Sequence, residues 1–152
     1  MSQMSRQITV EQGDALREEV LEGLRVFNEE AVGPYDIQHV RLAMRADDGT
    51  LLAGLVGMCY WNMLHVDLLW VAPTHRHSGC GTALLHRAEQ IAIDHGCDLV
   101  YLSTYSFQAP EFYRKQGYQP SGRLENGPAG FSTTWFSKRL DRIDQGETGA
   151  LC

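Results

Sequence analysis

The apolar residues of this chain follow a helical period near the N-terminus. After Asp14, a residue type that favours the position before a helix, they recur three or four residues apart, at Leu16, Val20, Leu24, Phe27 and Ala31. Gly33–Pro34 interrupts this spacing, so the sequence predicts a helix that ends there. A short strand is expected before it, over Gln7–Val10.

The pattern then changes to runs of β-forming residues over 40–46, 51–61 and 63–71. Asp48–Gly49 is a hairpin turn signal between the first two runs. Gly54 and Gly57 within the second run indicate a bulge. The three runs are therefore expected to form a meander of antiparallel strands.

A strand–helix–strand unit follows, with a helix over 81–95 and a buried strand over 98–104. A short helix over 109–116 and two closing strands, 118–124 and 131–140, complete the order of elements. This order predicts an α/β protein of the α+β type, with a mixed sheet and helices on both faces. We expect a single domain over residues 1–140 and a flexible tail over 141–152.

Composition narrows the class of protein without deciding its function. The 152 residues suffice for one domain, and 43% hydrophobic with 21% charged residues is typical of a soluble globular protein. No apolar run suits a membrane span, and the first six residues do not resemble a secretion signal, which favours a cytoplasmic protein without a membrane partner. The net charge of −6 argues against a nucleic-acid partner and suits a cationic ligand.

The cysteines and histidines indicate neither disulfides nor a metal. Cys59, Cys80, Cys97 and Cys152 show no CxxC spacing, and we expect reduced thiols. His75 and His77 lack the neighbouring cysteines or carboxylates of a zinc site, so no metal is expected.

The most informative segment is the loop between the third strand run and the long second helix, Arg76-His77-Ser78-Gly79-Cys80-Gly81. Exposed amides at a helix start bind anions, glycine permits close approach of the backbone, and arginine pairs with phosphate oxygens. No Gly-Lys-Ser/Thr occurs, which excludes a P-loop nucleotide site, and Leu84 stands where a dinucleotide-binding GxGxxG motif needs its last glycine.

This loop matches the [Gln/Arg]-x-x-Gly-x-[Gly/Ala] motif, and the chain resembles the GNAT superfamily of acetyl-CoA-dependent N-acetyltransferases. The segment 106–118 is similar to that superfamily's closing-helix motif, Asn-x-x-Ala-x-x-x-Tyr-x-x-x-Gly-[Phe/Tyr], with Ala109, Tyr113, Gly117 and Tyr118 in register. The resemblance implies the GNAT fold, with a mostly antiparallel sheet of about seven strands. Ser106 replaces the motif's asparagine, so its contact with pantetheine is expected to be lost, weakened or made by Gln108.

The resemblance implies that an amine attacks the thioester of acetyl-CoA directly, in a ternary complex. Tyr113 would protonate the departing thiolate, and the backbone N–H of Val71, or less favourably Leu69, would stabilise the oxyanion. Cys80 as a nucleophile is not expected, because direct transfer needs no covalent intermediate. The residues implied to bind the cofactor are Leu69, Val71, Arg76, His77, Ser78, Gly79, Cys80, Gly81, Thr82, Ser106 and Tyr113.

The general base is left open by the sequence. Asp67 is the first candidate, because two-residue alternation places it on the face of Leu69 and Val71 and a carboxylate in an apolar strand is costly unless it is used. A structural salt bridge explains Asp67 equally well. The further candidates are His65 on the same face, Glu29 and Glu30 at the end of the first helix, and a chain of water molecules.

The remaining aromatic and basic residues have structural interpretations first. Trp70 is expected in the core, and Trp61, Tyr35, Phe131 and Trp135 either pack or line an acceptor pocket. Arg114 and Lys115 form a solvated helix face or contact the 3′-phosphate of CoA.

The expected function is acetylation of a primary amine on a small cationic molecule. The alternatives are acetylation of a protein N-terminus or lysine, and a non-catalytic acyl-CoA-binding regulatory domain. The resemblance also allows a homodimer, which no residue pattern tests.

Overall fold

The computed structural model of the protein describes residues 6–141, and the chain divides between Tyr35 and Asp36 into two compact units. The first unit contains one helix, α1 (Ala15–Val32). It ends where Gly33 takes a φ of 102° and donates its N–H to the carbonyl of Glu29, as the Gly33–Pro34 signal predicts. The strand predicted over Gln7–Val10 is wrong, because these residues adopt no regular structure.

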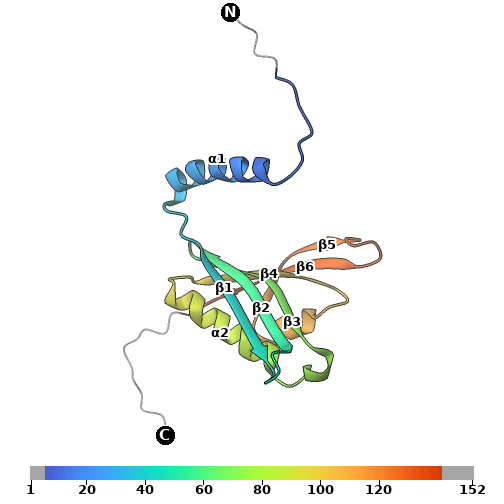
Figure 1. The fold of residues 1–152 in the computed structure, drawn as a ribbon. Helices are drawn as coiled ribbons and strands as arrows, with labels where there is room; N and C mark the ends of the chain where they lie inside the picture. Colours follow the sequence, from blue (N-terminus) through green and yellow to red (C-terminus); the bar gives the residue numbers. More distant parts are fainter. Residues whose placement is uncertain (1–5, 142–152) are drawn as a thin grey trace, which may run out of the picture. The chain divides into compact units, whose positions relative to one another are not determined.

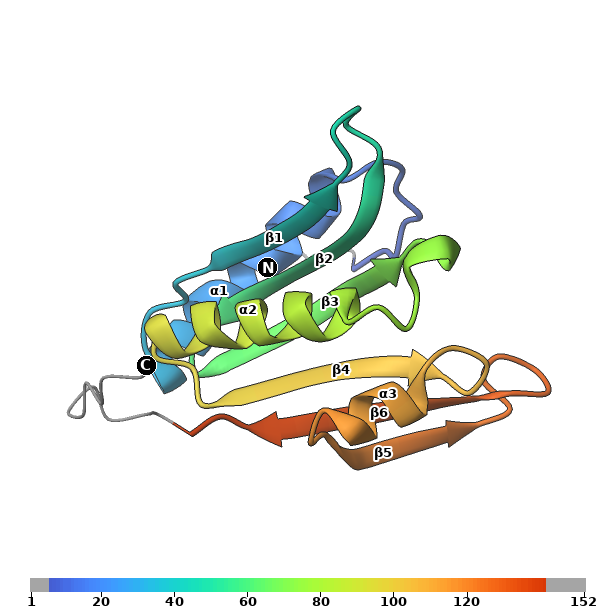
Figure 2. The same ribbon diagram turned by 90° about the horizontal axis from the view of Figure 1, so that it is seen from below.

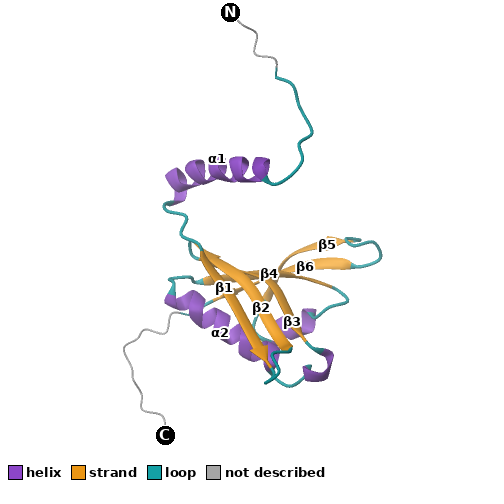
Figure 3. Ribbon diagram, in the orientation of Figure 1, coloured by secondary structure: helices purple, strands orange, loops and turns teal. Residues whose placement is uncertain are grey.

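The second unit is built on one open sheet of six strands in the order β1-β2-β3-β4-β6-β5, shown in Figures 1 and 3. The strands are β1 (Gln38–Arg45), β2 (Leu51–Tyr60), β3 (Met63–Val71), β4 (Leu99–Tyr105), β5 (Gln119–Glu125) and β6 (Ser132–Arg139). All neighbours are antiparallel except β3 and β4. The mixed, mostly antiparallel fold is therefore confirmed, with six strands in place of about seven. The prediction of a single domain over 1–140 stays a prediction, and the predicted tail lies outside the described residues except for Asp141.

Two helices of this unit, α2 (Cys80–Asp94) and α3 (Pro110–Lys115), cover the same face of the sheet (Figure 2). The alternation of β2 and β4 explains this layer, because every second residue of these strands is buried on one face. These residues join the apolar stripe of α2 in one core, which includes Leu55, Leu64, Leu85, Ala88, Val100, Leu102 and Phe136.

The alternation of β3 is broken by a bulge at Asp67. Val56 of β2 pairs with Leu68 and Gly57 pairs with Val66, so Asp67 is the extra residue. A Cβ on Gly57 would lie 2.4 Å from the carbonyl oxygen of His65, which explains why glycine stands opposite the bulge. The bulge that the glycines of β2 indicated is therefore present at Gly57.

The bulge changes which side chains of β3 face the core. Val66 is buried before it, and Leu69 and Val71 pack against the core after it. Trp70 therefore points to the opposite face and is 46% exposed, so its predicted core position is wrong.

The sheet opens at its centre because β3 and β4 pair over three positions only, Met63–His65 with Leu99–Tyr101. Beyond them the strands diverge (Figure 2), and β4 no longer pairs with the edge of β3 that faces it. This opening creates the candidate site. Among residues 6–141, no helix combines the length and apolarity that crossing a membrane requires.

Candidate active site

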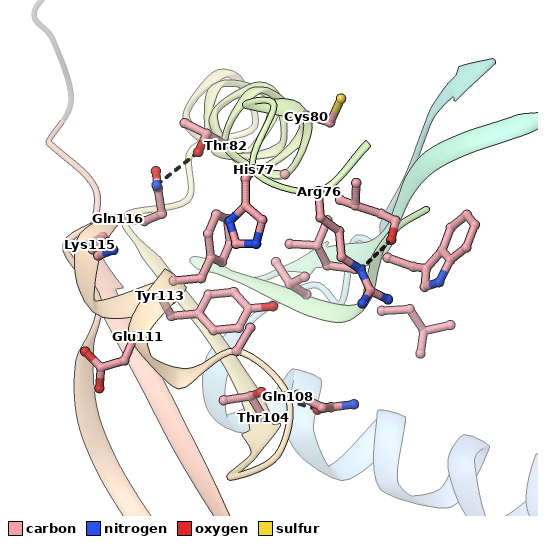
Figure 4. Close-up of a pocket in the computed structure, with 18 of the residues that line it drawn as sticks. Arg76, His77, Cys80, Thr82, Thr104, Gln108, Glu111, Tyr113, Lys115 and Gln116 are labelled. Atoms are coloured by element: carbon pink, nitrogen blue, oxygen red, sulfur yellow. Dashed lines mark hydrogen bonds between the residues drawn. The ribbon is translucent and has the colours of Figure 1, made fainter. Parts of the chain in front are cut away.

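An open cleft of about 970 Å³ lies where β3 and β4 diverge. Its walls come from the second half of β3, the loop that follows it, the first turn of α2, the end of β4 and α3, as Figure 4 shows. The cleft therefore brings together two sequence motifs that lie about thirty residues apart. Of the residues predicted to bind the cofactor, all but Ser78 and Ser106 line it.

The loop before α2 contains two residues with a left-handed backbone conformation. His77 has a φ of 60°, and Gly79, the N-cap of α2, has a φ of 87° with a ψ of 0°. The first N–H groups of α2, which have no acceptor within the helix, follow directly after Gly79. A non-glycine residue such as His77 adopts this conformation at a cost, which is typical of binding sites.

The edge of β3 that faces the cleft carries backbone groups that β2 does not use. Ala72 donates its N–H to the carbonyl of Leu52 at 2.8 Å, so the preceding pair, Ala53 and Val71, is a pair without mutual hydrogen bonds. The N–H and C=O of Val71 therefore point away from β2 and into the cleft, and the same alternation applies to Leu69. Arg76 donates from Nε to the Val71 carbonyl at 3.2 Å (Figure 4).

The first turn of α2 packs closely against α3. A Cβ on Gly81 would lie 3.3 Å from Cζ of Phe112 and 3.7 Å from a methyl group of Val71. Gln116 donates from Nε2 to the hydroxyl of Thr82 at 3.1 Å and joins the two helices across the cleft (Figure 4). A side chain at position 81 would therefore press against the Phe112 ring, whatever the loop binds.

Tyr113 projects its hydroxyl into the cleft from α3, while its ring is buried (Figure 4). The ring contacts those of Phe112, Tyr118 and Phe136, with centroid distances of 5.1, 5.9 and 6.1 Å. Burial raises the pKa of Tyr113 to about 12, so the phenol is neutral at physiological pH. Within residues 6–141, no hydrogen-bond partner is present for this hydroxyl.

The same cluster contains a partly buried ion pair, whose two residues do not line the cleft. Tyr118 donates its hydroxyl to Glu89 of α2 at 2.8 Å, and Nζ of Lys138 lies 3.1 Å from the same carboxylate. Burial, followed by the Glu89 charge, raises the pKa of Tyr118 above its ordinary value. Tyr118 thereby ties the end of α3 to α2 and supports the ring of Tyr113.

The sequence model of the Acetyltransferase (GNAT) family matches residues 14–118. The chain belongs to the GNAT acetyltransferase family. It is therefore an acyltransferase, and the open sheet and cleft described above are those of a GNAT fold.

Relatives of this GNAT chain are acetyltransferases as well. It is 41% identical over 93 residues to the blasticidin-S acetyltransferase of Streptomyces morookaense, which covers 60% of this chain and 68% of that protein. An acetyltransferase of Agrobacterium fabrum is 32% identical over 117 residues, covering 77% of this chain and 85% of the relative. The crystal structure of a Bacillus cereus acetyltransferase has a TM-score of 0.77 at 36% identity, covering 88% of this chain and 98% of that one.

The candidate bases of this GNAT enzyme fall in different places. Asp67 lies in the bulge, is exposed and lines the cleft, and its carboxylate has no ion pair or hydrogen bond with any described residue. His65 stacks on Tyr101 with ring centroids 4.7 Å apart. It alternates with the buried Leu64 and Val66, so the prediction that it shares the face of Leu69 and Val71 is wrong, since the bulge interrupts the alternation.

Glu29 and Glu30, the other candidate bases, belong to the first unit. Glu29 pairs with Arg25 at 3.0 Å and accepts the backbone N–H of Tyr35 at 3.2 Å. Their role in proton removal stays a prediction.

Three residues predicted to bind the cofactor use their side chains in other contacts, and their role in cofactor binding stays a prediction. The Ser106 hydroxyl accepts the backbone N–H of Ser132 at 3.1 Å, so it serves β6 and not the cleft. The Ser78 hydroxyl donates to the carbonyl of His75 in its own loop. Cys80 reaches the cleft wall, but its sulfur lies 3.2 Å from the hydroxyl of Ser78 and points away from Tyr113 (Figure 4).

Several residues that line the cleft belong to no sequence motif that would have predicted their position there. Gln116 follows Tyr113 by three positions, so helical spacing alone suggests a shared face. Phe107 and Glu111 had no such signal. Among residues 6–141, no group of three or more His, Cys, Asp or Glu side chains is arranged to hold a metal ion.

Proposed function

We propose that the protein transfers the acetyl group of acetyl-CoA to a primary amine on a small cationic molecule. The observation that carries this proposal is the free edge of β3. It presents the N–H of Val71 to a cleft that has an anion-binding helix start at one end and the hydroxyl of Tyr113 in its wall. The residues present fit acetyl-CoA, which supplies the activated acyl group when bound.

The phosphates of the cofactor are assigned to the loop 76–81. The amides of Gly79, Cys80 and Gly81 begin α2, where the helix dipole favours negative charge. Lys115 also lines the cleft and is the better candidate for the 3′-phosphate. Arg114 is already engaged, because it pairs with Glu111 at 3.2 Å and lies over the ring of Phe136.

The N–H of Val71 is assigned to the oxyanion that forms when the amine attacks. A fixed backbone donor in a partly desolvated cleft needs no reorganisation during the reaction, and the loss of one such donor typically costs a hundredfold or more. The bond from Arg76 to the Val71 carbonyl orients the adjoining Val71–Ala72 peptide on the same edge of β3.

Tyr113 is assigned to the leaving sulfur as a hydrogen-bond donor. A thiol has a pKa of about 8.5, whereas that of Tyr113 is raised to about 12. Full proton transfer from Tyr113 to a free thiolate is therefore uphill by roughly 5 kcal/mol. A hydrogen bond that strengthens as charge develops on sulfur needs no such transfer, so it is the more favourable role.

Asp67 is assigned to the incoming amine. An ordinary alkylamine is protonated at neutral pH and must lose a proton before it attacks. The carboxylate of Asp67 lines the cleft without a competing partner among the described residues, so it is available to attract an ammonium group and accept its proton. The net charge of −6 supports a cationic acceptor, and the name of the blasticidin-S acetyltransferase supports a small molecule.

The cofactor assignment is tested by a matched pair of variants at Gly79. Gly79→Asp and Gly79→Asn introduce side chains of the same shape where no atom lies within 4 Å of the new Cβ, and both residue types tolerate the left-handed conformation. Only aspartate adds negative charge. Two phosphate charges about 5 Å away are each repelled by roughly 0.8 kcal/mol in water, which predicts about tenfold weaker acetyl-CoA binding than in Gly79→Asn.

Calorimetric titration with acetyl-CoA measures this difference, and thermal unfolding provides the control. Aspartate at a helix start stabilises the free helix, so Gly79→Asp should unfold no earlier than Gly79→Asn while binding the cofactor more weakly. Equal affinities of the two variants for acetyl-CoA would refute the assignment of the cofactor phosphates to this loop.

A further inference from the structure

Three aromatic rings form an exposed cluster at the end of β4 and the start of β6. Tyr105 and Phe107 stack with ring centroids 5.3 Å apart at 24°, and Phe131 meets Phe107 edge-on at 4.9 Å. We call Tyr105, Phe107 and Phe131 the aromatic shelf. Their exposed fractions are 41, 56 and 49%, so each ring keeps a surface open to solvent despite the mutual contacts.

The shelf is held rigid by hydrogen bonds that use the polar residues between its rings. Ser106 donates its backbone N–H to the carbonyl of Ser132 at 2.8 Å and accepts the Ser132 N–H on its hydroxyl, which fixes Phe107 beside Phe131. Gln108 accepts the backbone N–H of Tyr105 at 3.0 Å and the hydroxyl of Thr104 at 3.3 Å. A fixed apolar surface loses little conformational entropy when a ligand covers it.

The shelf lies on the side of the sheet that the cofactor loop does not occupy. Leu102 and Thr104 are buried on the face covered by α2 and α3, so Tyr105 projects from the opposite face. Phe107 nevertheless lines the cleft, together with Ser103 and Asp67. The shelf therefore adjoins the cleft at Phe107, whereas Tyr105 and Phe131 lie outside its lining.

We propose that the aromatic shelf is the acceptor subsite and selects amines that carry a flat aromatic or heteroaromatic ring. The ring stacks on Phe107 while the ammonium group turns toward Asp67. Asp67 is preferred as the partner of the ammonium group because Glu111, the other carboxylate of the cleft within the described residues, is paired with Arg114. Stacked aromatic pairs are favourable beyond the area they bury, and exposed aromatic clusters on a rigid surface are typical of binding sites. This proposal rests on the proposed function, since it names the acceptor of that same cleft.

The test compares two ammonium probes of equal charge and chain length, 2-phenylethylamine and 2-cyclohexylethylamine. The saturated ring buries at least as much apolar surface, so a preference for the flat ring reports stacking and not general hydrophobicity. Wild-type protein with acetyl-CoA should acetylate 2-phenylethylamine with about fivefold higher kcat/KM. Phe107→Leu should abolish this preference, whereas Phe107→Tyr, which keeps the ring, should retain it.

Each outcome bears on one proposal. Equal kcat/KM for the two amines, or a preference that survives in both Phe107→Leu and Phe131→Leu, would overturn the shelf as acceptor subsite. If wild-type protein fails to bind acetyl-CoA, the proposed function is wrong. In that case the calorimetric affinities of the two amines for the free protein still test whether the aromatic shelf binds flat rings, because stacking on Phe107 does not need the cofactor.

Discussion

Replacement of Tyr113 by phenylalanine separates its catalytic role from its packing role. The substitution keeps the ring and its contacts with Phe112, Tyr118 and Phe136, and removes only the hydroxyl. Because this hydroxyl has no hydrogen-bond partner among the described residues and its burial raises the pKa to about 12, the native protein gains no stability from it. We therefore expect the melting temperature of Tyr113→Phe to equal or exceed that of the wild type.

The size of the loss in kcat distinguishes two roles of the hydroxyl. A hydrogen bond to a charged group contributes about 1.5–3 kcal/mol, which corresponds to a fall in kcat of roughly 10- to 150-fold. General-acid catalysis reaches about 10⁴-fold. Since full proton transfer from Tyr113 is uphill, we expect a value in the lower range and unchanged affinity for acetyl-CoA.

Steady-state release of free thiol measures kcat, and calorimetry measures cofactor affinity. Tyr118→Phe is the matched control, because the same change there removes a hydrogen bond to Glu89. It should lower the unfolding free energy by about 1–2 kcal/mol and leave kcat much less affected than Tyr113→Phe does. A Tyr113→Phe variant with full kcat, or one that loses activity only in proportion to its stability, would refute the assignment.

Three further predictions concern charge and pH. Asp67→Asn should lower kcat/KM and remove the acidic limb of its pH profile without changing the melting temperature. An altered melting temperature with normal activity would instead show that Asp67 has a structural role. Glu89→Ala should lower the unfolding free energy in urea by about 3 kcal/mol, because it leaves Lys138 and the Tyr118 hydroxyl without their acceptor, and Glu89→Gln should cost less. The protein should lose stability as the pH rises from about 10 toward 12. Over that range the raised pKa of Tyr113 keeps its phenol neutral in the folded state, whereas the same phenol ionises in the unfolded chain. Tyr113→Phe should therefore lose less stability over the same range.

The sequence predicts the elements well where one face is buried. The boundaries of α2 and β4 lie within one or two residues of the predicted 81–95 and 98–104, because their apolar periods report directly on the core between sheet and helix. The period fails at the bulge of β3. One extra residue there moves Trp70 to the opposite face, and glycines in β2 indicate a bulge without saying which residue of the partner strand is extra.

The candidate site divides in the same way. Motifs within one stretch of chain identified Arg76, Gly79 and Tyr113, which line a common cleft, because each motif reflects the local backbone conformation of its own element. Contacts between segments that are distant in the sequence leave no such local pattern, so they could not be predicted. The role of Ser106 depends on Ser132 of another strand, and the aromatic shelf forms only when Phe107 and Phe131 meet across that junction.

The three-pair seam between β3 and β4 also divides the sheet mechanically. On either side of it, strands are joined by long antiparallel ladders, whereas the seam has few backbone bonds of its own. Local opening there requires the rupture of far fewer hydrogen bonds than fraying at any other junction of the sheet, so the amides beside the seam should exchange with solvent deuterium fastest among the central strands. A ligand that lies in the gap contacts both halves at once, and its binding is therefore expected to slow exchange on β3 and β4 together, coupling the two halves into one cooperative unit.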